Sequence, residues 1–173
     1  MIVSRESSFR GDALESHVSM PSQGVDRTFS LDIGGDRTTE DVLSGGHYQG
    51  GINPMISMAN FPWRLRHGRR VIEFVDMVQH GFSETYLFSD ALGVLEKRGL
   101  GRPIYEDGML FGEQYPARQA KDVVMFPHEP VGDCEGCPTV VCIWGDGGYH
   151  ALYLGWVNRG FRSGVLVAGV HWT

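Results

Sequence analysis

Hydrophobic residues are spread unevenly along this chain, being isolated in the first 60 residues and gathered into dense runs after Phe61. In the first part, serine, glycine and charged residues separate single hydrophobes, and Gly-Gly pairs interrupt any period. One short alternation, over residues 28–33, predicts a strand. Such a segment cannot by itself bury enough apolar surface to offset its ordering entropy. We therefore predict an extended polar arm over residues 1–60 and a globular domain over residues 61–173.

The globular part contains patterns typical of strands and of one main helix. Strands are predicted over residues 71–78 and 123–126, where apolar residues are dense. The helix is predicted over residues 84–98, with Ser83 as N-cap and Gly99 just beyond its end. Its apolar stripe consists of Leu87, Phe88, Ala91, Leu92 and Leu95.

The C-terminal third has the pattern of an antiparallel meander. Two strand-like runs, 139–144 and 149–157, flank a glycine-rich tetrapeptide that is typical of a hairpin turn, and a third run covers 162–172. One helix against such strands predicts an α+β, mainly β fold. Both faces of 149–157 are apolar, so we expect cover on both sides. The arm, a partner chain or the weakly patterned segment 104–120 could supply that cover.

The charge of the chain disfavours some partners. The formal net charge is −6, and the first 60 residues account for −4 of it, with 4 basic and 8 acidic residues. Because an acidic chain repels phosphate backbones, nucleic acid is not an expected partner. The sequence has no apolar run long enough to span a membrane and no apolar secretory region at its start. We therefore expect a cytoplasmic or intracellular location.

A basic cluster and two apolar residues are the candidate interaction residues. Four arginines fall within seven positions: Arg64, Arg66, Arg69 and Arg70. They fit an anion or nucleic-acid patch, a solvated connection before the next strand, or a docking point for an acidic neighbour such as the arm of another copy. We favour the last two. Phe29 and Leu31 are expected to anchor the arm on its own sheet or on a neighbouring subunit.

Three cysteines form the candidate metal site. Cys134 and Cys137 are spaced as C-x-x-C, a pattern whose two thiolates can bind zinc, and Cys142 could add a third ligand. With the hairpin turn centred on Asp146 and Gly147, Cys142 and His150 project from opposite faces of the sheet, so His150 does not complete the set. No second paired ligand set occurs. We therefore expect no cofactor, with zinc as the alternative.

No sequence motif points to a reaction. The chain contains no nucleophile elbow, P-loop, dinucleotide fingerprint or H-E-x-x-H. We therefore expect a non-enzymatic structural subunit that acts through protein–protein contacts in a multi-copy homo- or hetero-oligomeric complex, such as a virion or phage particle. One alternative is a monomeric protein-binding module, such as an inhibitor or immunity-type protein. Another is a small zinc- or thiol-dependent hydrolase.

Overall fold

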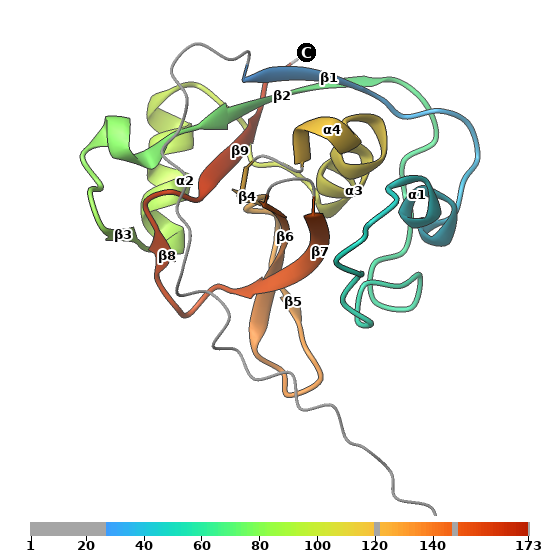
Figure 1. Ribbon diagram of the computed structural model, residues 1–173. Coiled ribbons are helices and arrows are strands. Elements are labelled where there is room, and N and C mark those ends of the chain that lie inside the picture. Colours follow the sequence, from blue (N-terminus) through green and yellow to red (C-terminus); the bar gives the residue numbers. More distant parts are fainter. Residues whose placement is uncertain (1–26, 120–121, 147–148, 173) are drawn as a thin grey trace, which may run out of the picture.

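The computed structural model describes residues 27–119, 122–146 and 149–172, and within them a seven-stranded mixed sheet forms the centre of the molecule (Figure 1). Its strands are β1 (Thr28–Asp32), β2 (Arg69–Val75), β4 (Val124–Met125), β5 (Val131–Gly132), β6 (Pro138–Asp146), β7 (Tyr149–Trp156) and β9 (Leu166–Val170). β7 pairs with β6 along one edge, so β4 and β5 share the other edge of β6. From β4 the sheet continues through β9 and β2 to β1.

Helices cover both faces of this sheet, as the two apolar faces of the sequence require (Figure 1). Residues alternate along each strand, so that Val141 contributes to one buried cluster and its neighbour Cys142 to the other. The first cluster includes residues of α1 (Thr39–Gly45) and α3 (Tyr105–Gln114), and the second includes residues of α2 (Phe88–Lys97). The segment 104–120 was one of the predicted sources of cover, and its helix α3 does cover the sheet.

Smaller elements complete the two layers. A 3₁₀ helix (Met77–His80) and a two-stranded sheet lie on the α2 side, where Met77 and Tyr86 are part of the second cluster. The two-stranded sheet consists of β3 (Thr85–Tyr86) and β8 (Phe161–Arg162), and a short helix α4 (Pro116–Gln119) follows α3. No helix within the described ranges is long and apolar enough to cross a membrane.

The predicted helix begins later than expected. Residues 85–86 form β3, so Ser83 is not an N-cap, and α2 begins at Phe88. The Asp90 carboxylate accepts a hydrogen bond from the Leu87 backbone N–H at 2.7 Å and so caps the helix start. Its end agrees with the prediction, because Gly99 adopts a positive φ of 69° just beyond it.

The predicted meander is correct for its hairpin and wrong for its last strand. β6 and β7 pair in antiparallel fashion, but Trp144 lies opposite Ala151 rather than Tyr149. This shift by two residues leaves the faces unchanged, so Cys142 and His150 still lie on opposite faces. The run 162–172 is split: its start pairs with β3, whereas β9 lies between β2 and β4. β9 is a central strand that is buried on both faces, so it needs a neighbouring strand on each side. Those neighbours are β2 and β4, and β7 is not one of them.

The described part of the predicted arm belongs to the globular fold. β1 pairs with β2, and its residues Phe29 and Leu31 are 8% and 0% exposed. Val42 and Leu43 of α1 are also buried in the first cluster. The predicted boundary at residue 60 is therefore wrong for residues 27–60, and residues 1–26 lie outside the described ranges. The average composition of residues 1–60 gave no sign of β1 and α1, because these short segments bury their few hydrophobic residues in a core that the rest of the chain supplies.

Candidate interaction surfaces

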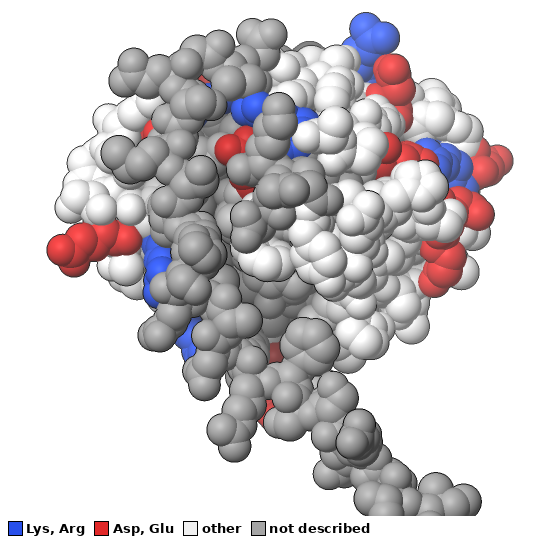
Figure 2. Space-filling view, viewed as in Figure 1, with Lys and Arg blue, Asp and Glu red and all other residues white. Residues whose placement is uncertain are grey.

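The four arginines of the basic cluster each form an ion pair within the chain. The pairs are Arg64 with Glu106, Arg66 with Asp36, Arg69 with Asp32, and Arg70 with Asp107. On the face presented in Figure 2, positive and negative side chains likewise lie beside each other. Because each guanidinium faces a carboxylate, the cluster offers an acidic partner less positive charge than the sequence predicts.

Two of these pairs are built on buried carboxylates at the start of α3. Glu106 and Asp107 are both 0% exposed and occupy the first turn, where the positive end of the helix favours acidic residues. Arg70 donates two hydrogen bonds to Asp107, which also accepts one from the Ile104 N–H at 2.9 Å. Burial raises the pKa of Asp107, and the charge of Arg70 opposes that rise. These contacts hold the segment 64–70 against α3.

A cavity of about 220 Å³ lies beside this cluster. The Arg64 guanidinium stacks over the Tyr105 ring at 4.7 Å from its centroid. His128 is buried and accepts a hydrogen bond from the Val141 N–H through Nε2 at 2.8 Å. Its Nδ1 lies 2.6 Å from the Glu129 carbonyl oxygen and donates to it. The lining residues are Arg64, Ile104, Tyr105, His128, Glu129, Pro130 and Val131.

His128 acts as a structural residue in this arrangement. Burial lowers its pKa to about 4, and the charges of Arg102 and Arg64 contribute to the decrease. The imidazole is therefore neutral at pH 7, with both ring nitrogens engaged by the backbone. It ties β6 to the residues that follow β4 and has no ring nitrogen left for proton transfer.

The structure does not bring the three cysteines together as one ligand set. Cys134 is exposed and Cys137 half-buried in the turn between β5 and β6, whereas Cys142 is fully buried in β6. Burial raises the pKa of the Cys142 thiol to about 12, which disfavours the thiolate that binds metals. Within residues 27–119, 122–146 and 149–172, no three His, Cys, Asp or Glu side chains gather in a way that could hold a metal ion.

Asp133 holds the C-x-x-C turn in place. Its carboxylate accepts hydrogen bonds from the backbone N–H groups of Glu135 and Cys137, at 2.9 and 2.8 Å. It also accepts one from the indole N–H of Trp156 at 3.0 Å. The turn is thus closed by a carboxylate and the backbone, and its conformation does not require a bound metal.

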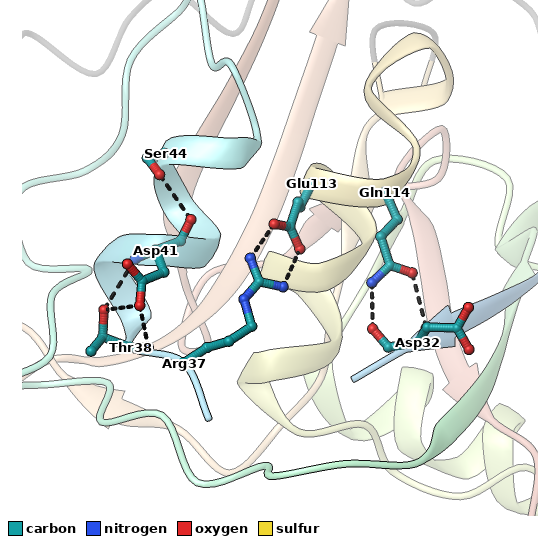
Figure 3. A network of polar contacts seen from close by, with 7 residues as sticks. All are labelled: Asp32, Arg37, Thr38, Asp41, Ser44, Glu113 and Gln114. Carbon is teal, nitrogen blue, oxygen red and sulfur yellow. Dashed lines mark hydrogen bonds and ion pairs between the residues drawn. The ribbon is translucent and has the colours of Figure 1, made fainter. Parts of the chain in front are cut away.

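A polar network that the sequence analysis did not single out joins α1, α3 and β1 (Figure 3). Arg37 forms an ion pair with Glu113 of α3, with one contact of 2.9 Å. Gln114 of α3 hydrogen bonds with the backbone of Asp32. At the start of α1, Thr38 and Asp41 form a reciprocal capping box, which was the available sequence signal for this helix.

Several large apolar side chains are exposed although the core is covered on both faces. Trp172 is the most exposed at 79%, and its indole lies against Gly101, where a Cβ would come within 2.9 Å of the ring. A cavity of about 340 Å³ opens there, lined by Leu92, Leu95, Glu96, Gly99, Leu100, Gly101, Arg102 and Trp172. The other exposed residues are Met58, Val78, Leu87, Tyr149 and Trp156.

The expected positions of some side chains can be compared with the structure. Phe29 and Leu31 were expected to anchor on their own sheet or on a neighbouring subunit, and they lie in β1 and pack in the first cluster of their own chain. Leu87 was predicted to face the core, and it is 57% exposed because α2 begins after it.

A scan against protein-family models found no match, and neither did searches of curated proteins and of solved structures.

Proposed function

We propose that this chain is a non-enzymatic structural subunit that acts through protein–protein contacts in a multi-copy complex, of the kind that forms a virion or phage particle. The observation that carries this proposal is the set of exposed apolar side chains, with Trp172 79% and Leu87 57% exposed. Tryptophan is enriched among the residues that dominate binding energy at protein interfaces. Burial of one such side chain contributes about 1.5–3 kcal/mol.

Two buried titratable groups, Asp107 and His128, support a non-enzymatic role. Asp107 is paired with Arg70, and both ring nitrogens of His128 are bonded to the backbone. A general acid or base needs an atom within reach of substrate and a pKa near the working pH. These groups instead connect one element of the fold to another.

A monomeric protein-binding module is the second candidate function, and the cavity beside Trp172 favours it. That cavity combines leucines with a tryptophan and has Glu96 and Arg102 among its lining residues. An apolar hollow with a few charged groups suits one anchoring side chain of a different protein. This function requires a partner and no self-association.

Light scattering after size-exclusion chromatography, over a wide range of concentrations of the untagged full chain, separates the two functions. The structural subunit should show a mass above the 19.2 kDa of one chain, rising with concentration. A constant mass of 19.2 kDa at every concentration would contradict the proposal and favour the monomeric module.

A further inference from the structure

The outer edge of β7 is half covered. The His150 carbonyl oxygen accepts a hydrogen bond from the Gly50 N–H at 2.8 Å. Leu152 donates to the Gly51 carbonyl at 3.2 Å and accepts from the Asn53 N–H at 2.9 Å. The segment 50–53 therefore lies along the first half of the strand.

Among the described residues, none pairs with the second half of this edge. Outward backbone groups recur at every second residue of an edge strand, so those that follow Leu152 belong to Leu154 and Trp156. The inward hydrogen bond from Val157 N–H to the Pro138 carbonyl agrees with this register. Within the described ranges, no residue hydrogen bonds with the Leu154 backbone or with the Trp156 N–H. The Trp156 carbonyl accepts only a long bond, 3.3 Å, from the Arg159 N–H.

Side chains bond to part of the opposite edge of the sheet. On β1, the outward Ser30 carbonyl accepts a hydrogen bond from the Tyr115 hydroxyl at 2.8 Å. Both outward groups of Asp32 are bonded to the Gln114 amide. Exposed strand edges pair readily with other strands, and most proteins block them. Side chains thus occupy outward groups of Ser30 and Asp32 on β1, whereas no described residue forms such contacts with Leu154 or with the Trp156 N–H.

We propose that two copies of this chain pair through the open part of β7, antiparallel and around a two-fold axis at Gly155. This inference rests on the proposed function and names the contact surface. In this register Leu154 of one copy lies opposite Trp156 of the second copy, and each such pair exchanges two backbone hydrogen bonds. The sheet then continues from one subunit into the other.

The shape and charge of the edge favour a second copy as the occupant. Gly155 lies between the part of the strand that the segment 50–53 covers and the turn that follows Trp156, so a pairing centred on Gly155 uses the uncovered residues 154–156. The run 149–158 contains no charged residue, so two copies meet there without like-charge repulsion. Near Trp156 the charges cancel, because Arg159 stacks on its ring at 4.3 Å and Asp133 binds its indole N–H.

Leu154 and Trp156 also suit this pairing by their side chains. Both project from the same face of β7, as their register with Val141 and Thr139 shows. Trp156 is 40% exposed and Leu154 is partly buried against the first cluster. Directly opposite across the two-fold axis, they form an apolar cross-strand pair.

Amide hydrogen exchange of the full chain at low and high concentration tests the pairing directly. The amides of Leu154 and Trp156 should exchange rapidly when dilute and slow at least tenfold when concentrated. Equal rates at all concentrations, whether fast or slow, would overturn the proposal. A slow, concentration-independent rate would mean that another segment of the same chain occupies the edge.

Analytical ultracentrifugation of three variants supplies the second test. Leu154→Pro removes the outward N–H at a position where an edge strand tolerates proline, and it should abolish dimers. Leu154→Val keeps the N–H and should leave the dimer unchanged, as should Ser30→Pro on the β1 edge. Oligomers that persist in Leu154→Pro would overturn this contact while leaving the proposed function in place. Monomers at every concentration of the unmodified chain would overturn both.

Discussion

The side-chain amide of Gln114 hydrogen bonds with both backbone groups that Asp32 turns outward from β1 (Figure 3). The Asp32 N–H donates to Gln114 Oε1 at 2.9 Å, and Gln114 Nε2 donates to the Asp32 carbonyl. A glutamine amide carries one acceptor and one donor side by side, as a peptide group does. Gln114 therefore occupies this edge of the sheet in place of a further strand.

Replacement of Gln114 by alanine should uncover this edge. We expect faster hydrogen exchange at the Asp32 amide and a free energy of unfolding lower by about 1–2 kcal/mol, because two hydrogen bonds are lost. Urea denaturation and amide exchange measure the two effects. The matched control is Gln79→Ala, since the side-chain hydrogen bond that Gln79 forms among the described residues, to Asp76 at 3.5 Å, is weak. An unchanged exchange rate at Asp32 would contradict the interpretation.

The buried pair between Arg70 and Asp107 should matter far more for stability than its exposed neighbour. Asp107→Asn removes the charge that faces Arg70 in a site where Asp107 is 0% exposed, and we expect a loss of about 3 kcal/mol in urea unfolding. The control comes from the same segment: the Arg66–Asp36 pair is exposed, 79% and 87%. Asp36→Asn should change the stability by less than about 0.5 kcal/mol. Similar losses in both variants would show that burial does not decide the effect.

His128 should make stability depend on pH below neutrality. Its folded pKa of about 4 lies below the ordinary value of 6.5, so the unfolded chain binds the proton more readily. The contribution is complete above pH 6.5 and is lost as the pH falls from 6.5 to 4. The total loss is about 3 kcal/mol.

A variant separates this contribution from that of other groups. His128→Gln keeps one acceptor and one donor but does not titrate, so its free energy of unfolding should vary less between pH 7 and pH 4. The comparison requires urea unfolding of both proteins at several pH values. Parallel profiles for the two proteins would assign the pH dependence to other groups.

Local patterns predicted those elements whose signals are local. The alternation over 28–33 predicted β1, the glycine-rich tetrapeptide predicted the β6–β7 hairpin, and Gly99 predicted the end of α2. α3 was missed because it is buried on nearly all sides, including Glu106, so that no polar face gives it a helical period.

The remaining features depend on partners distant in sequence. The position of β9 between β2 and β4 follows from packing across the whole sheet, which no local pattern records. Arg64 and Glu106 are 42 positions apart, so the basic cluster could not be recognised as internally paired. The open edge of β7 is likewise defined by where the segment 50–53 ends, not by any residue type.

Two glycine substitutions should change stability in opposite directions. At Gly169 of β9, a Cβ would lie 2.7 Å from Leu95 Cδ2 and 2.9 Å from Leu100 Cδ1. Gly169→Ala therefore forces two core side chains to move, and we expect a loss of about 1–3 kcal/mol. At Gly93, inside α2, a Cβ would meet no atom within 4 Å apart from its chain neighbours and the backbone of its own helix. Gly93→Ala should raise stability by about 0.5–1 kcal/mol in the same urea experiment, and a gain at Gly169 would contradict the packing described for β9.

Truncation should show that the core extends well before residue 61. A chain that begins at Phe61 lacks β1 and α1, and with them the buried side chains of Phe29, Leu31, Val42 and Leu43. Loss of each such side chain costs roughly 2–5 kcal/mol, which together exceeds the usual stability of a domain. We therefore expect this chain to lack a cooperative thermal transition by circular dichroism.

The control is a chain that begins at Arg27, which keeps every residue of β1 and α1. It should unfold cooperatively, because the Arg27 carbonyl bonded to the Phe74 N–H and the pairing of β1 with β2 are retained. If the chain beginning at Phe61 instead folds like the control, residues 27–60 are a dispensable addition, and the boundary predicted from composition is the correct one. If both chains fail to fold, residues 1–26 contribute stability that the contacts of β1 and α1 do not explain.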